Sequence, residues 1–240
     1  MSSESLEQQR AAVRPLLSLS DPGDALAVYY ALYHDPKRTQ LTLHYDVSGR
    51  VDGFVAVCRT GQDLFRPVVT LRARSRPVLA EMLLQALLPG RTYICVVPDE
   101  LAVALHAFVN VSGASLNLVH VLDANRFQPV INVLVQLGHG ADGLPKAVIR
   151  SGDGRIVAEA GLNWRSPYFA EVYVHTDPAV RGRGYGRSVV ASLTALLLEE
   201  GVRSLYVVPE GHTESIQLAH SLGYVDSGSR EYQGEISLKQ

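Results

Sequence analysis

Two periods of apolar residues divide this sequence into helices and strands. Leu6, Val13 and Leu16 fall on one stripe of a helix, whereas Val51–Cys58 forms an almost continuous apolar run bounded by turn residues. Prolines, glycines and aspartates separate such segments along the chain. We therefore expect the first half to contain, in order, helices at 5–18 and 21–35, strands at 40–45, 51–58 and 67–71, a helix at 77–87, a strand at 93–97, a helix at 98–108 and a strand at 115–122.

The second half shows a similar order of elements. Its longest helix is expected to run from the glycine turn after residue 181 to Glu200, and Gly201 is placed to end it. The other elements expected here are strands at 131–137, 147–150, 156–162, 168–176 and 204–208, a helix at 213–222, and one or two strands within 224–238. Alternating helices and strands of this kind predict an α/β protein with a mixed sheet.

Short local likenesses suggest that the halves are repeats of each other. Cys95–Pro98 and Tyr206–Pro209 both have Val-Val-Pro before a helix, and Gly49-Arg50-Val51 resembles Gly154-Arg155-Ile156. The two pairs are 111 and 105 residues apart, nearly the same offset. We therefore predict two domains, residues 1–125 and 126–240, joined near 123–129.

Composition narrows the classes of function. The chain is 47% apolar and 19% charged, its formal net charge is −2, and it has no long basic run, so nucleic acid is a poor candidate partner. No apolar run approaches the roughly 20 residues of a membrane helix, and the first residues do not resemble a signal peptide. Cys58 and Cys95 lie in strand-like runs without metal-type spacing. We expect a cytoplasmic protein with two buried free thiols and no membrane association.

The turn from Arg181 to Arg187 carries the clearest chemical signal. It has glycines at 182, 184 and 186 and arginines at 181, 183 and 187, and it lies between a strand and a helix. Glycine permits backbone angles that turn several N–H groups into one concavity, and the helix start adds unpaired N–H donors. Arginines nearby can form charge-assisted bonds with phosphate oxygens. A solvated basic loop is the alternative, but the position of the turn favours a pyrophosphate site.

These residues resemble the signature of a known superfamily. Arg181–Gly186 fits the Arg/Gln-x-x-Gly-x-Gly/Ala motif of the GNAT superfamily, the acyl-CoA-dependent N-acetyltransferases. The lead-in Val174–Pro178 and the run Leu218–Tyr224 resemble the flanking strand and the later helix of that motif, so the likeness covers about residues 145–228. The resemblance implies a GNAT fold in the second half, acetyl-CoA as cosubstrate and no required metal.

The resemblance also implies the residues that bind the coenzyme. Backbone amides of 182–187 would hold the pyrophosphate, and strand 168–176 would diverge from strand 204–208 so that Val174 and Thr176 pair with the pantetheine arm. Ser215 could contact the coenzyme or cap its helix. The set expected on this basis is Val174, His175, Thr176, Arg181, Gly182, Arg183, Gly184, Tyr185, Gly186, Arg187, Ser188, His212 and Ser215.

Strand alternation suggests the catalytic base. Phe169, Glu171, Tyr173 and His175 share one face of their strand, and a strand face with Glu, Tyr and His is typical of a working cleft. Glu171 also resembles the base of histone-type acetyltransferases, so we expect Glu171 as general base with His175 as the next candidate. A carboxylate paired with an arginine such as Arg165 is the alternative.

Two features depart from the family pattern. The tyrosine that protonates the leaving thiolate in many members aligns with Ala219, which leaves Tyr224 and His220 as substitutes for the acid. The two helices that usually form part of the acceptor site have no room between Leu137 and Ala147. We therefore expect the first half to complete the acceptor wall.

The first half has the element order of a GNAT domain but no glycine in Arg72–Arg76, so we expect it to be a degenerate, non-catalytic copy. The sequence thus predicts a tandem GNAT protein, monomeric or homodimeric, that moves an acetyl group from acetyl-CoA to a primary amine of a small molecule or peptide. The alternatives are a non-catalytic acyl-CoA-binding module and glycine N-acyltransferase-like transfer of a longer acyl group.

Overall fold

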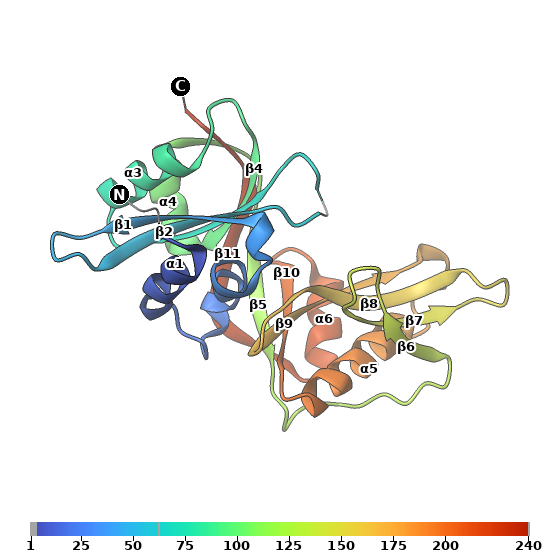
Figure 1. The fold of residues 1–240 in the computed structure, drawn as a ribbon. Helices are drawn as coiled ribbons and strands as arrows, with labels where there is room; N and C mark the ends of the chain where they lie inside the picture. The colour runs from blue at the N-terminus through green and yellow to red at the C-terminus, as the bar shows by residue number, and fades with distance from the viewer. Residues whose placement is uncertain (1–3, 62, 240) are drawn as a thin grey trace. The chain divides into compact units, whose positions relative to one another are not determined.

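The computed structural model describes residues 4–61 and 63–239. The chain divides into two compact units (Figure 1). The first unit comprises residues 1–117 together with 229–240, and the second unit comprises residues 118–228. The last segment of the chain therefore packs with the first half of the sequence. The domains proposed from the sequence, 1–125 and 126–240, differ in giving this segment to the second half.

The first unit is a mixed sheet with helices on both faces. Its strands lie in the order β1-β2-β3-β4-β11-β5. Its elements are α1 (Leu6–Val13), η1 (Arg14–Leu16), η2 (Pro22–Asp24), α2 (Ala25–Val28), η3 (Tyr29–Tyr33), η4 (Pro36–Arg38), β1 (Thr39–Tyr45), β2 (Val51–Cys58), β3 (Val68–Ala73), α3 (Arg76–Ala86), β4 (Tyr93–Pro98), η5 (Asp99–Leu101), α4 (Ala102–Leu105), β5 (Val109–Leu122) and β11 (Tyr224–Leu238).

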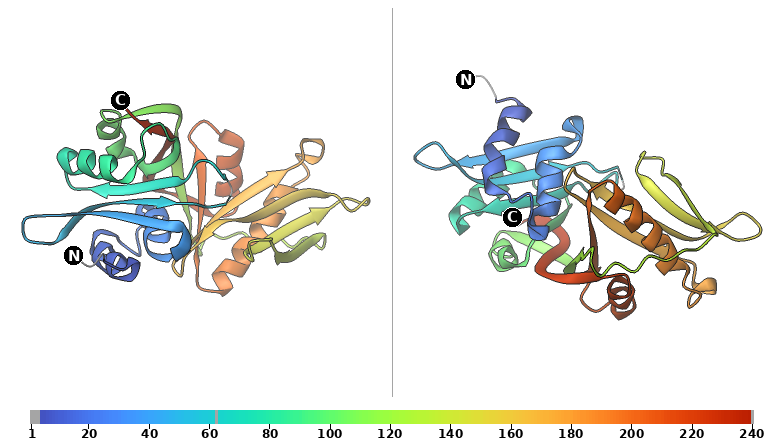
Figure 2. Two further views of the ribbon diagram at one scale, coloured as in Figure 1. Left: turned by 45° about the horizontal axis from the view of Figure 1, so that its top comes forward. Right: turned by 90° about the horizontal axis from the view of Figure 1, so that it is seen from below.

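Local sequence explains the helices that cover this sheet. Ser5 begins α1 with a capping box in which its hydroxyl accepts from the Gln8 amide. The apolar face of α3 packs into the core of the unit, where Leu79 and Met82 are buried. Gly53 in β2 allows this close packing, because a Cβ atom there would lie 2.8 Å from the Met82 methyl carbon. Figures 1 and 2 show α1 and α3 on opposite faces of β1 and β2.

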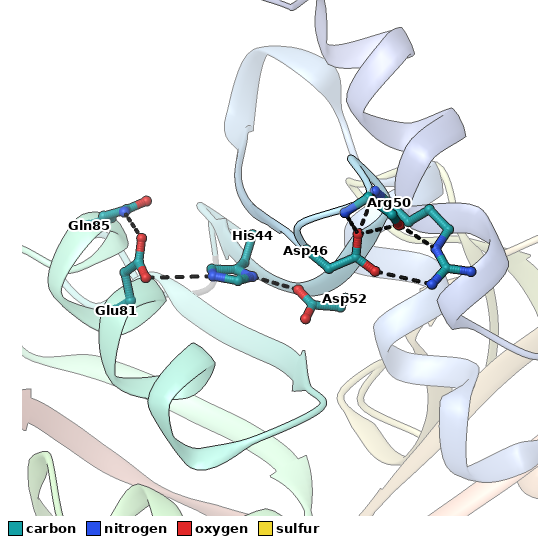
Figure 3. A network of polar contacts seen from close by, with 7 residues as sticks. His44, Asp46, Arg50, Asp52, Glu81 and Gln85 are labelled. Atoms are coloured by element: carbon teal, nitrogen blue, oxygen red, sulfur yellow. Dashed lines mark hydrogen bonds and ion pairs between the residues drawn. The ribbon is translucent and has the colours of Figure 1, made fainter.

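A polar cluster ties β1, β2 and α3 together (Figure 3). The His44 Nδ1 atom lies 2.5 Å from Asp52 Oδ1, and its Nε2 atom lies 3.5 Å from Glu81 Oε2. Gln85 donates to the other Glu81 oxygen at 3.0 Å. The hydrogen bond to Asp52 raises the pKa of His44, so the cluster favours a protonated imidazole.

The second unit is also a mixed sheet. Its strands lie in the order β11-β5-β10-β9-β8-β7-β6. Its further elements are β6 (Val135–His139), β7 (Pro145–Arg150), β8 (Ile156–Arg165), β9 (Phe169–Thr176), η6 (Pro178–Val180), α5 (Tyr185–Glu199), β10 (Arg203–Pro209) and α6 (Thr213–Ser221). The long helix α5 lies along β7, β8 and β9 (Figure 2) and buries Val189, Leu193 and Leu197. This packing follows from the apolar stripe of α5.

Each unit is completed by strands from both halves of the sequence. In the first unit, the later part of β11 pairs antiparallel with β4 from Glu231 to Ile236. In the second unit, β5 lies next to β10, and the early part of β11 follows it, where Ser227 Oγ donates to the Val119 carbonyl at 2.6 Å. Short-range patterns cannot reveal such a pairing, because its partners lie about a hundred residues apart.

Several expected boundaries need correction. Residues 98–108 form only short helices, β5 begins at Val109 instead of 115, and 224–238 is a single strand. The strand expected at 131–137 is β6 at Val135–His139. Asn132 explains this shift, because its side chain accepts from the Leu134 amide at 3.0 Å and its carbonyl accepts from the Val135 amide. This local turn replaces the first half of the expected strand.

The expectation for the cysteines is confirmed. Cys58 and Cys95 are free and fully buried, and burial raises the pKa of each thiol to about 12. Among residues 4–61 and 63–239, no helix is both long enough and apolar enough to cross a membrane.

Candidate functional site

The strands β9 and β10 of the second unit diverge. Their parallel ladder pairs Phe169–Glu171 with Arg203–Leu205 and then ends, although β9 continues to Thr176 and β10 to Pro209. On its other edge, β9 stays paired with β8 as far as Thr176. The divergence expected from the resemblance is therefore present. It leaves one edge of β9 beyond Glu171 available to an extended ligand.

The glycine turn follows the end of β9 directly. Gly182 and Gly184 have φ angles of +78° and +75°, which side chains with a Cβ atom adopt only at a cost. Gly184 is also the N-cap residue of α5. Backbone N–H groups of 182–187 have no hydrogen-bond acceptor within the described part of the chain. Six donors at the start of a fifteen-residue helix form a concavity suited to an anion.

Gly186 has a different purpose. Its φ angle is not positive, but a Cβ atom there would lie 2.8 Å from Thr176 Oγ1. The glycine thus lets the first turn of α5 pack against the end of β9, which brings the unpaired amides to the point where β9 diverges. Of the three glycines, Gly182 and Gly184 provide positive φ angles, and Gly186 allows the close approach of helix and strand.

The arginines of the turn fall into two groups. Arg181 and Arg183 are exposed and have no ion-pair partner among the described residues. Arg187 is held by the Ser221 carbonyl at 3.2 Å, and its buried Nε atom has no partner within that same set. Only Arg181 and Arg183 are therefore free to meet a phosphate from solvent.

Ser188 is a correction to the expected coenzyme-binding set. Its side chain is buried, donates to the Gly184 carbonyl at 3.0 Å and accepts from Asn132 at 3.1 Å. These bonds hold the turn against the segment before β6, so the hydroxyl is not open to a ligand. Tyr185 also packs its side chain against the core, which leaves its backbone amide as the group facing the concavity.

Glu171 lies where the β9–β10 ladder ends. Asn163 Nδ2 and Trp164 Nε1 each donate to one of its oxygens at 2.6 Å. A β-bulge in β8 between Leu162 and Trp164 brings these consecutive side chains to the same carboxylate. Arg165, the partner considered in the alternative, pairs instead with Glu200 at 2.6 Å.

The surroundings of Glu171 shift its acidity. Burial raises the pKa of its carboxyl, while the hydrogen bonds from Asn163 and Trp164 act in the opposite direction. A carboxylate with a raised pKa is a better proton acceptor near neutral pH than an ordinary one. The side chain is half-buried, so part of it is accessible to solvent. Glu171 is thus a partly exposed carboxyl with a raised pKa at the end of the β9–β10 ladder.

The other residues on this face of β9 lie in different environments. His175 is exposed, opposite Glu159 of β8. Tyr173 is half-buried and hydrogen-bonded to Lys146, whose ammonium lies 2.8 Å from Glu159 Oε2. Phe169 is fully buried beneath the Arg203 guanidinium, 4.6 Å from its ring centre. The face expected from alternation exists, and its outer half carries the polar groups.

A cavity of about 230 Å³ adjoins Tyr173. It is lined by the connection between β6 and β7, including Asp142, by Lys146 of β7 and by Gly161 of β8. That connection is a tight turn in which the Gly140 amide donates to the Leu144 carbonyl at 2.8 Å, so the expected absence of room for two helices is confirmed. The short turn therefore forms one wall of a small pocket within the second unit itself.

The structure argues against Tyr224 as the acid. Its side chain is 1% exposed, and its hydroxyl bonds to Thr194 Oγ1 at 2.8 Å and Ser204 Oγ at 2.5 Å. Burial raises its pKa to about 12. Because Thr194 and Ser204 are themselves fully buried, the Tyr224 hydroxyl is enclosed between two core side chains and cannot approach a thiolate in the opening between β9 and β10.

Tyr206 is a tyrosine that the sequence reasoning missed. It lies on β10 beyond the last residue that β10 pairs with β9, and its side chain is 3% exposed. Unlike the Tyr224 hydroxyl, its hydroxyl has a partly exposed partner, Ser215 Oγ on α6, at 2.9 Å. Ser215 therefore bonds to a side chain instead of capping α6, and His212, which precedes that helix, is exposed and makes no capping bond. Ala219, one helical turn after Ser215, is fully buried. The signal was present in the sequence as a lone hydroxyl within the apolar run 205–208.

Comparisons with known proteins agree with this geometry. Residues 152–232 match the family described as FR47-like protein. A search of curated proteins finds no significant match. A structure of a Drosophila protein is similar with a TM-score of 0.71 at 14% identity, covering 98% of this chain and 96% of that one.

Two further similar structures carry functional names. A tandem GNAT protein from the clavulanic acid biosynthesis pathway, solved without acetyl-CoA, has a TM-score of 0.61 at 14% identity and covers 98% of this chain and 94% of its own. A putative GNAT acetyltransferase from Novosphingobium aromaticivorans has a TM-score of 0.58 at 16% identity, covering 78% and 89%. The expected fold class is thereby confirmed. The chain has the fold of the GNAT superfamily, and its residues 152–232 match the FR47-like family, which is related to it.

Proposed function

We propose that the second unit is an N-acyltransferase that uses acetyl-CoA and transfers the acetyl group to a primary amine. The observation that carries this proposal is the joint presence of unpaired amides at 182–187 and an unpaired strand edge beyond Glu171. The first suits a pyrophosphate and the second suits an extended amide-containing arm, the two parts of coenzyme A that a protein can hold in this way. Arg181 and Arg183 would add charge-assisted bonds.

In this proposal, residues of this chain accept the proton from the amine and donate a proton to the leaving thiolate. The thioester supplies an activated carbonyl, and attack by the amine nitrogen forms the C–N bond and breaks the C–S bond. Glu171 would accept the proton that the amine loses, directly or through a water molecule. The Tyr206 hydroxyl is our candidate for returning a proton to the departing sulfur, because it lies on β10 beyond the ladder, beside α6. Each proton thus has a donor or acceptor on a strand that borders the opening.

We propose that the cavity beside Tyr173 receives the acceptor. Tyr173 shares a face of β9 with Glu171, and the cavity carries one carboxylate, Asp142, and one ammonium, Lys146. Its volume of about 230 Å³ suits a small amine or a single side chain of a peptide. We also propose that the first half of the chain is a degenerate, non-catalytic GNAT-like copy.

A non-catalytic acyl-CoA-binding module is the second candidate, and the buried Ala219 at the family's tyrosine position favours it. An assay distinguishes the enzyme from the binding module: the protein is mixed with acetyl-CoA and a panel of amines, and the release of free thiol is measured. Turnover on any amine supports the enzyme, whereas tight coenzyme binding without turnover supports the module. Propionyl-CoA and benzoyl-CoA in the same assay test the transfer of longer acyl groups.

A further inference from the structure

A basic hollow lies in the first unit, at the edge of the sheet where β1 begins. Its volume is about 430 Å³. The residues that matter for its chemistry are Lys37, Arg38, Thr39, Gln40, Arg59 and Arg91. It is distinct from the glycine turn, which belongs to the second unit.

Strand topology brings the cations of this hollow together. Thr39 at the start of β1 pairs with Cys58 at the end of β2, Cys58 pairs with Val68 at the start of β3, and Val68 pairs with Ile94 at the start of β4. These four residues form one row across the sheet, with neighbouring strands about 5 Å apart. The cations precede or follow this row by one to three residues. Residues far apart in the sequence therefore meet at one edge.

The positive charge of the hollow is largely uncompensated. Arg38 pairs with Asp35 at 3.6 Å, and both side chains are about half exposed. Within the described ranges, Lys37, Arg59 and Arg91 have no ion pair with a carboxylate. The protein as a whole carries a slight negative charge, so this concentration of cations is a local feature. Cations gathered in a concave site attract anions more strongly than the same cations on a flat surface.

Two of these cations, Arg59 and Arg91, and the backbone that carries Lys37 and Arg38 are held in place before any ligand binds. The Arg59 guanidinium donates to the Lys37 carbonyl at 3.0 Å, and its backbone amide donates to the Arg38 carbonyl at 2.9 Å. Asp35 fixes the turn by accepting from the Lys37 amide at 2.9 Å. Arg91 lies 5.6 Å from the ring centre of the buried Tyr93. Because two arginine side chains and the backbone of the turn are already ordered, binding an anion costs less conformational entropy.

We propose that this hollow binds a small molecule that carries a diphosphate group. Guanidinium groups match phosphate oxygens in geometry, and Lys37 adds a compact charge. Three cations without a carboxylate partner exceed what one phosphate group can contact well, which favours two linked phosphates. The hollow lies at the start of β3 and β4, whereas the separation of these strands begins after Val69 and Cys95. It is therefore not a second copy of the proposed coenzyme site, and it does not depend on acyl transfer.

Isothermal titration calorimetry with inorganic pyrophosphate tests this proposal. The titrations use the full chain carrying Arg181→Gln and Arg183→Gln, which weakens the glycine turn as a competing site. One equivalent of pyrophosphate should still bind. Adding Arg59→Gln and Arg91→Gln should lower the affinity at least tenfold, because two charge-assisted contacts are lost. Lys37→Gln, at an exposed position, should lower it less and serves as a second variant if the first misfolds.

Arg50→Gln is the matched control, because Arg50 is an exposed arginine of the same unit that pairs with Asp46. Equal losses for Arg50→Gln and the Arg59/Arg91 variant would overturn the proposal, as would inorganic phosphate binding as tightly as pyrophosphate. Parallel titrations with ADP and coenzyme A identify the source of the diphosphate. If the Arg181→Gln and Arg183→Gln substitutions left pyrophosphate binding the same as in the wild type, the proposed coenzyme site would be wrong. That result would not affect the proposal for the basic hollow.

Discussion

The two units contain the same arrangement of strands at corresponding places, yet only one of them has a glycine turn with unpaired amides after the first strand. In the second unit, β9 and β10 separate after Glu171 and Leu205. In the first unit, the parallel strands β3 and β4 separate after Val69 and Cys95. In both, the first strand of the pair continues for several residues and leads into a helix, α5 or α3.

The difference lies in the residues between strand and helix. The second unit has Gly182 and Gly184 with positive φ angles, and its amides are unpaired. The first unit has no residue with positive φ between β3 and α3, and Pro77 removes an N–H from the start of α3. Its Arg72, moreover, is bound to Asp24 by hydrogen bonds of 3.0 and 2.7 Å. Both units therefore have diverging strands, whereas the turn proposed to bind phosphate depends on a few residues that one unit has and the other lacks.

The largest effect is expected from making the second unit resemble the first at this turn. Arg181→Gln with Gly184→Ala should weaken coenzyme A binding about 100-fold, because a charge-assisted contact and the left-handed turn are both lost. Calorimetry measures the affinity. The matched control is Arg150→Gln with Gly201→Ala, since Gly201 has a φ angle of +71° at the other end of α5. Retained affinity in the first variant, or equal loss in the control, would show that the turn does not bind the coenzyme.

The carboxylate at the opening provides the next contrast, because the β9–β10 ladder ends at Glu171, whereas the β3–β4 ladder ends at Val69. Glu171→Gln should lower kcat about 100-fold with unchanged coenzyme affinity, the size typical of a lost general base. In the wild type, the rate should rise with pH through a pKa above the ordinary 4.5 of a glutamate, because only the ionised form accepts a proton. The glutamine variant should lose this dependence.

Glu200→Gln serves as the control, because Glu200 is a carboxylate of the same unit that pairs with Arg165. Its kcat and pH profile should stay close to those of the wild type. If the rate of the Glu171→Gln variant still rose with pH as in the wild type, Glu171 would not be the base but a structural residue held by Asn163 and Trp164.

Substitutions of two tyrosines of the second unit should affect different properties, the rate in one case and the stability in the other. Tyr206→Phe should lower kcat about tenfold, because the leaving thiolate loses its proposed proton donor. Tyr224→Phe should leave kcat unchanged and lower the free energy of unfolding by about 1–3 kcal/mol, since the hydroxyls of Thr194 and Ser204 lose a buried partner. Steady-state kinetics and urea unfolding of both variants measure the two effects. The opposite pattern would exchange the roles of the two residues.

The smallest effect concerns the polar cluster of the first unit. The hydrogen bond to Asp52 raises the folded-state pKa of His44 above 6.5, so its contribution to stability is complete below pH 6.5 and is lost as pH rises through the folded-state pKa. His44→Gln should therefore lower the free energy of unfolding by about 1 kcal/mol at pH 6 and less at pH 9. Asp52→Asn should show the same trend in urea unfolding, and a pH-independent loss in both variants would contradict the assignment.

Local sequence was sufficient for some parts of the fold. The apolar periods and the punctuating Gly and Pro residues located most helices and strands, because an isolated segment already fixes its own buried face. They failed where tertiary partners decide the boundary. Strand β5, which begins earlier than expected, lies beside β11, more than a hundred positions away in the sequence. Asn132 interrupts an apolar run with a turn that its side chain stabilises.

The sequence by itself determined the glycine turn, because the ability of Gly182 and Gly184 to adopt positive φ angles and the small size of Gly186 are properties of the residues. Only the tertiary structure decided which neighbouring groups are available. It enclosed Tyr224 and Ser188, brought Asn163 and Trp164 to Glu171 through a bulge, and placed Tyr206 beside Ser215. The physical reason is that hydrogen bonding and burial depend on which strands lie side by side, and strand order is set by contacts along the whole chain.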